Sequence, residues 1–128
     1  MPGRTRFVGQ RDLAELVPLY GACDLFAWPA VNEAYGMAML EAEAAGLPVI
    51  SSHLRGVPDV VIDGTTGLLA PPDDESAFAA RVRALLTDPA RRDAMGAAAA
   101  RFVASERGVD VAAQRLARAF AALREPRG

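Results

Sequence analysis

The chain has 128 residues, of which 52% are hydrophobic and 23% charged, so it suits one compact domain and is too short for two domains of ordinary size. The formal net charge is −2, and only 6% of the residues are aromatic. A nucleic-acid-binding surface needs clustered basic residues interleaved with aromatic ones, so we do not expect nucleic acid as a partner.

A single cysteine, Cys23, excludes a disulfide or a thiolate metal cluster within the chain and fits a reducing, cytoplasmic setting. We expect Cys23 at a buried helix end. The first residues lack the apolar segment of a signal peptide, and no apolar run approaches the roughly 20 residues that span a bilayer. The sequence therefore predicts neither secretion nor a membrane span, and peripheral attachment to a membrane stays open.

Short apolar runs alternate with helical patterns along the chain. In chain order the patterns predict a strand at 5–8, a helix at 12–22, a strand at 24–28 with Trp28 in the core, a helix at 36–45, a strand at 49–52, a helical turn at 58–62, a strand at 68–70, and helices at 76–86, 89–104 and 109–123. The continuous apolar character of 49–52 indicates a parallel strand covered on both faces. The alternation of strands and helices predicts an α/β fold with a parallel sheet.

A candidate binding site lies in the loop PAVNEAYG, which leads from the carboxyl end of the strand at 24–28 into a helix. Ligands of open α/β sheets collect at such strand ends. Ala34 and Gly36 let a ligand approach the backbone closely, and the amides of Tyr35, Gly36 and Met37 at a helix start suit a phosphate. No Walker or dinucleotide glycine pattern is present, so this signal alone is weak.

Glu41 makes the signal more specific. It lies on the same face as Met37, Ala44 and Ala45 of a helix that we expect to be mostly buried. A carboxylate has two acceptor oxygens, which match two adjacent ribose hydroxyls, and about 7 to 8 Å separates Glu41 from the helix start. Glu33 would lie beyond the phosphates. The residues alone leave open that Glu41 is an ordinary, partly exposed helix residue and that Glu33 helps to cap the helix.

The run EAYGMAMLEAEAAGLPVISS, followed by GVPDVVIDGTTGLLAPPDD, resembles the donor-binding segment of the group 1 glycosyltransferases. These enzymes have the GT-B fold of two Rossmann-like domains. The shared pattern contains two acids in an E-x7-E motif, here Glu33 and Glu41, with an aromatic-Gly-aliphatic step between them. An A-G-x-P-V strand entry and a D-G-x-x-G-x-L-x-x-P run follow. The resemblance covers about residues 6–104.

The resemblance implies a retaining hexosyltransferase whose substrate is a nucleotide-diphosphate sugar, with no cofactor and no bound metal. It implies that Glu41 holds the ribose and that the backbone at residues 35–37, next to the small Ala34, contacts the diphosphate and sugar. Glu33, as the catalytic residue, would face the transferred sugar near its anomeric carbon. On this interpretation Glu41 is buried because a ribose covers it.

The chain departs from the family pattern in two respects. Family members usually have Gly-Gly before x-P-E, whereas this chain has Arg55 and Gly56, and Asp59 in place of the glutamate. The resembled enzymes are also much longer, with an N-terminal acceptor domain and an Arg and a Lys that neutralise the diphosphate. This chain begins after both. We therefore expect a single partial domain, with an α/β core at 1–108 and a C-terminal helix and tail at 109–128.

Two classes of function remain. The first is the donor-binding part of a glycosyltransferase, inactive without its acceptor domain. The second is a non-catalytic interaction or oligomerisation module that retains the fold. An unpaired border strand at 5–8 and the apolar stripe of the last helix also predict a homodimer through the C-terminal helix or the sheet edge.

Overall fold

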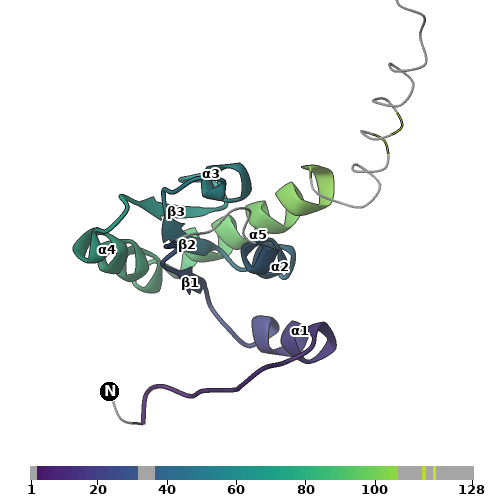
Figure 1. Ribbon diagram of the computed structural model, residues 1–128, viewed down its shortest axis with the longest axis horizontal. Helices are drawn as coiled ribbons and strands as arrows, with labels where there is room; N and C mark the ends of the chain where they lie inside the picture. The colour runs from purple at the N-terminus through teal and green to yellow at the C-terminus, as the bar shows by residue number, and fades with distance from the viewer. Residues whose placement is uncertain (1–2, 32–36, 107–113, 115–116, 118–128) are drawn as a thin grey trace, which may run out of the picture.

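The computed structural model describes residues 3–31, 37–106, 114 and 117 (Figure 1). The elements are, in order, α1 (Leu13–Gly21), β1 (Phe26–Trp28), α2 (Met37–Ala44), β2 (Val49–Ser52), α3 (Val57–Val60), β3 (Gly67–Ala70), α4 (Glu75–Leu86) and α5 (Pro89–Glu106). Each helix and strand predicted between residues 12 and 104 is present, with ends within two residues of those predicted. The predicted helix at 109–123 lies outside the described residues apart from positions 114 and 117.

The three strands form one parallel sheet in the order β1-β2-β3 (Figure 1). In the central strand, Val49 pairs with Phe26 of β1 on one side and with Gly67 of β3 on the other. All residues of β2 and β3 are buried, whereas β1 is half-buried at Phe26 and exposed at its next two residues. The apolar run of β2 thus marks a central parallel strand, as predicted.

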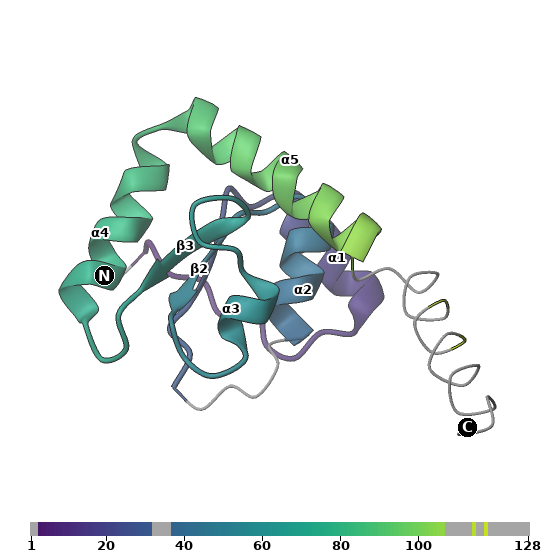
Figure 2. The ribbon, with the colours of Figure 1, turned by 90° about the horizontal axis from the view of Figure 1, so that it is seen from above.

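Each face of the sheet has its own core, because successive side chains of a strand point to opposite faces. Val49 and Leu69 pack into one cluster with residues of α1, α2 and α3. Ile50 and Leu68 pack into a second cluster with residues of α4 and α5. Figure 2 shows α3 and α4 on opposite sides of β2 and β3. Full burial of one such aliphatic side chain stabilises the fold by roughly 1.5–3 kcal/mol.

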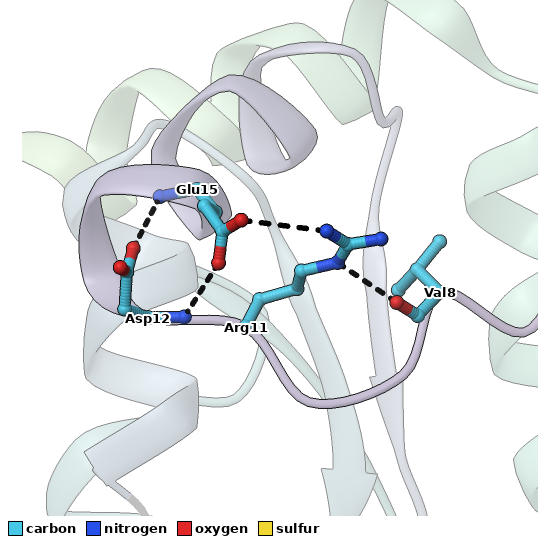
Figure 3. A network of polar contacts seen from close by, with 4 residues as sticks. All are labelled: Val8, Arg11, Asp12 and Glu15. Carbon is cyan, nitrogen blue, oxygen red and sulfur yellow. Dashed lines mark hydrogen bonds and ion pairs between the residues drawn. The ribbon is translucent and has the colours of Figure 1, made fainter.

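The first helix begins at a capping box (Figure 3). The Glu15 amide donates to the Asp12 carboxylate at 2.9 Å, and the Asp12 amide donates to the Glu15 carboxylate at 3.1 Å. Arg11 donates to the carbonyl of Val8 at 2.8 Å and pairs with Glu15 at 3.4 Å. The two bonds between Asp12 and Glu15 satisfy backbone amides that lack partners at a helix start, and so they fix the residue at which α1 begins.

α2 and α5 pack with their backbones in close approach. Gly96 of α5 is buried, and a Cβ atom added there would collide with the backbone of Gly46, two residues after the end of α2. Gly46 itself has a φ of 83°, a conformation that favours glycine. This approach fixes which side of α2 faces the core and which side faces outward.

Three sequence predictions are wrong in this part of the fold. Residues 5–8 form no strand but an exposed segment, with Phe7 93% exposed, because no described strand lies beside them. Trp28 is 46% exposed because β1 is the border strand of the described sheet, and its ring stacks on Phe26 at 6.4 Å. Cys23 is exposed because it follows the end of α1 rather than lying within a packed helix. Among the described residues, no helix is both long and apolar enough to cross a membrane.

Candidate functional site

Two of the six predicted donor-binding residues can be placed. Met37 is the first residue of α2, and its side chain is 60% exposed. Glu41 follows one helical turn later and is half-buried. The remaining four predicted positions lie outside the described residues: Glu33, Ala34, Tyr35 and Gly36.

α2 has one buried and one open face. Met39, Ala42 and Glu43 are buried against the core. The face with Met37 and Glu41 is open, and Ala44 and Ala45 on that face are exposed as well. The expectation that this helix is mostly buried is therefore wrong for the face that carries the predicted site. That face is accessible to a ligand.

The two carboxylates of α2 differ completely in accessibility. Glu43 is fully buried on the core face, with 0% of the residue exposed. Glu41, two residues earlier, lies on the other face and is half-buried. Of these two acids, Glu41 is therefore the one that a ligand at the surface can reach.

Tyr20 of α1 holds the Glu41 carboxylate. Its hydroxyl donates to Oε2 of Glu41 at 3.2 Å. The Tyr20 ring is only 9% exposed and meets Phe26 edge-on, with ring centroids 6.1 Å apart at 70°. Burial, followed by the charge and the hydrogen bond of Glu41, raises the pKa of Tyr20 above its ordinary value of 10.0. The hydroxyl consequently stays protonated, and able to donate, well above neutral pH.

Tyr20 was not among the predicted site residues; it lies within the helix predicted at 12–22. A signal was available, because a buried tyrosine hydroxyl usually finds a hydrogen-bond partner. Which residue would be that partner depends on how α1 and α2 pack, and the spacing of residues along the chain does not specify it.

A cavity of about 560 Å³ lies where β1 and β2 end and α4 begins. Its lining residues are Pro29, Ala30, Val31, Ser52, Asp73, Asp74, Glu75 and Phe78. Neither Met37 nor Glu41 lines it. Pro29, Ala30 and Val31 belong to the predicted binding loop, whose next five residues lie outside the described part of the chain, and the three acids in the lining disfavour a diphosphate.

The loop after β2 shows what the departure from the Gly-Gly pattern means. Arg55 is exposed and adopts a φ of 47°, the left-handed region in which an L-residue pays roughly 1–2 kcal/mol. A glycine at this position would avoid that cost. The loop therefore keeps a backbone suited to glycine but carries an arginine side chain.

The protein-family model described as "Glycosyl transferases group 1" matches residues 1–102, which is most of the chain. The chain belongs to the group 1 glycosyltransferases. Within the described residues, no group of three or more His, Cys, Asp or Glu side chains is placed to bind a metal ion.

Two relatives illustrate the range of this glycosyltransferase family. The chain is 39% identical over 102 residues to the D-inositol 3-phosphate glycosyltransferase of Corynebacterium diphtheriae. It is likewise 39% identical over 102 residues to the glycogen synthase of Mycobacterium tuberculosis. Each match covers 80% of this chain but only 24% and 25% of the two relatives. The chain thus spans about a quarter of the length of the curated relatives it matches.

Solved structures agree on the fold. Sucrose-phosphate synthase from Thermosynechococcus elongatus superposes with a TM-score of 0.87 at 33% identity, covering 95% of this chain and 31% of that protein. HepE of Anabaena in complex with UDP gives a TM-score of 0.84 at 25% identity, covering 93% and 32%. The C-terminal domain of LpcC from Francisella tularensis gives 0.70 at 22% identity, covering 82% and 53%. The chain has the Rossmann-like arrangement of a GT-B glycosyltransferase.

The substitution Glu41→Gln should lower the pKa of Tyr20, because it removes a nearby negative charge and leaves the burial unchanged. Ultraviolet difference absorbance follows the titration, and Tyr20→Phe identifies the Tyr20 signal among the two tyrosines. The sign for stability follows from the raised pKa. The part of the free energy of unfolding that depends on Tyr20 is fully present below pH 10 and is lost as the pH rises through the folded-state pKa of Tyr20. The free energy of unfolding of Tyr20→Phe should therefore fall less over that range than that of the parent. An unchanged Tyr20 titration in Glu41→Gln would contradict the Tyr20–Glu41 contact.

Proposed function

We propose that this chain supplies the nucleotide-sugar-binding part of a glycosyltransferase that transfers a hexose from a nucleotide-diphosphate sugar. The observation that carries the proposal is the reachable Glu41 carboxylate on the open face of α2, the helix that follows the carboxyl end of β1. Family membership supports it, and so does the likeness to HepE, which was solved in complex with UDP.

Glu41 is proposed to bind the ribose. One of its oxygens accepts from Tyr20, and the carboxylate has further acceptor positions for two adjacent hydroxyls. Four residues separate Glu41 from Met37 at the start of α2, a rise of about 6 Å, which suits the step from a diphosphate to its ribose. The amides of the first turn of α2 need partners outside the helix and, with the helix dipole, favour an anion.

The remaining roles follow the family pattern. We propose that the backbone from Ala34 to Met37 contacts the diphosphate and sugar. Glu33 is the proposed catalytic residue beside the anomeric carbon, in a reaction that retains configuration. The names of the two relatives point to unlike acceptors, D-inositol 3-phosphate and glycogen, although both share this segment with the chain. A shared segment with different acceptors fits a donor-binding role.

The proposal predicts that Glu41→Gln weakens binding of the cognate nucleoside diphosphate by about 1.5–3 kcal/mol, the range for a hydrogen bond to a charged group. This loss corresponds to roughly 10- to 150-fold in the dissociation constant, which calorimetry or amide NMR titration measures. Equal affinity of the mutant, or equal affinity of the parent for a 2′,3′-dideoxy nucleotide, would contradict the ribose contact.

Glu75→Gln is the matched control. It makes the same chemical change in the acidic cavity at the start of α4. If the nucleotide binds at α2, this variant should keep the parent affinity. If the diphosphate instead enters the cavity, removing a carboxylate there should tighten binding.

We propose that the 128-residue chain alone transfers no sugar. Transfer requires donor and acceptor to be held together, and such positioning accounts for roughly 7–11 kcal/mol of barrier lowering. The acceptor domain is proposed to lie in the part of the relatives that this chain does not span. Release of nucleoside diphosphate together with a glycosylated product, from purified chain and nucleotide sugar, would show the proposal to be wrong.

The second candidate function is a non-catalytic interaction or oligomerisation module. The observation that favours it is the border strand β1, where Ala27 and Trp28 are exposed, with Val31 83% exposed just beyond. Exposed apolar side chains on a strand at the border of the described sheet favour pairing with a second copy. We expect light scattering at tens of micromolar to give a dimer mass. A monomer near 13.5 kDa would exclude a homodimer through this edge.

A further inference from the structure

The orientation of the Glu41 carboxylate is set by a residue from another helix. Glutamate on a helix surface samples many rotamers, and ordering it costs conformational entropy. Here the Tyr20 hydroxyl reaches Oε2 of Glu41 across 21 positions of sequence, from α1 to α2. A half-buried carboxylate with one oxygen already held has fewer orientations available before any ligand arrives.

We propose that Tyr20 is a positioning residue for the donor site, which holds Glu41 in the orientation that accepts the two hydroxyls of the nucleotide ribose. The inference rests on the proposed function, since it assigns to Tyr20 a part in nucleotide binding at the same site. Tyr20 does not itself touch the nucleotide. It acts by lowering the cost of ordering Glu41.

The position of the Tyr20 ring suits this role. Among the residues of α1 whose side chains are described, Tyr20 alone is buried, and its ring rests edge-on against Phe26 of β1. The capping box at Asp12 and Glu15 fixes where α1 begins and therefore which side of the helix Tyr20 occupies. The hydroxyl is thus presented by a side chain that the core keeps in place.

A neutral donor is also the right chemical type for this task. An arginine or lysine in the same place would neutralise the carboxylate and compete with the ribose for its lone pairs. A phenol hydroxyl occupies one acceptor position and leaves the negative charge. The raised pKa of Tyr20 keeps the hydroxyl protonated, so the contact is present over the working pH range.

The competing explanation is that the hydrogen bond only fastens α1 to α2. The two explanations differ in their dependence on the ribose. A positioning role predicts that loss of the hydroxyl weakens a nucleotide that has ribose hydroxyls and leaves its 2′,3′-dideoxy analogue unaffected. A purely structural role predicts the same change, or none, for both nucleotides.

The experiment measures dissociation constants of the 128-residue chain and its variants by amide NMR titration. UDP, GDP and ADP are compared first, and the tightest is then used together with its 2′,3′-dideoxy analogue. We expect Tyr20→Phe to bind the ribonucleotide about three- to tenfold more weakly and to bind the dideoxy form within about twofold of the parent. In Tyr20→Phe/Glu41→Gln the ribonucleotide affinity should be no lower than in Glu41→Gln alone, because the two residues act as a unit.

Leu16→Ala is the matched control, because Leu16 packs on the same core from the same helix but leaves the hydroxyl intact. It should change both affinities by the same factor. A ribose-dependent loss in Leu16→Ala equal to that in Tyr20→Phe would overturn the inference. Equal ribonucleotide affinity in the parent and Tyr20→Phe would also overturn it and leave the proposed function intact. No binding of any of the three nucleotides to the parent at millimolar concentration would overturn both.

Discussion

Burial of β2 on both faces is the constraint from which the positions of the other elements follow. A parallel strand without a solvent-facing side needs helices over each face of its sheet. Val49 and Ile50 point in opposite directions, and so the helices divide into two layers. All three strands run the same way, and the segments that follow them therefore leave the same edge. α2 follows from that edge, and its close approach to α5 holds one of its faces against the core.

Because α2 has one buried and one open face, a ligand can reach only one of its two carboxylates. Glu43 is enclosed by the core and out of reach of a ligand. Glu41 is half-buried, which strengthens its electrostatic interactions relative to a fully solvated side chain, and its described partner is the neutral hydroxyl of Tyr20. Its carboxylate therefore has acceptor positions left for a ligand. The acidic cavity near α4 has the opposite preference, since its carboxylates disfavour phosphates.

Much of this architecture could be predicted from local signals in the sequence. The apolar run at Val49–Ser52 marked the central strand, and the helical pattern at 12–22 marked α1 to within one residue at each end. The two acids in E-x7-E marked the candidate site, although its first acid, Glu33, lies outside the described residues. These features could be found because each depends on residues close together in the chain.

The errors concern properties that depend on distant parts of the chain. The segment at 5–8 has the composition of a strand, but a strand also needs a neighbour to pair with, and the described sheet provides none. The exposure of Trp28 depends on whether another strand lies beyond β1. The role of Tyr20 depends on the packing of α1 against α2. The spacing of residues in one helix does not determine any of these.

The central claim is that the open face of α2, with Glu41 held by Tyr20, is where a nucleoside diphosphate binds. Backbone amide NMR during titration of the chain with UDP and GDP tests it most directly. The account predicts that the largest shifts occur in Met37–Glu41 and at Tyr20. Shifts centred instead on the acidic cavity at Ser52 and residues 73–75, or no shifts at millimolar nucleotide, would contradict it.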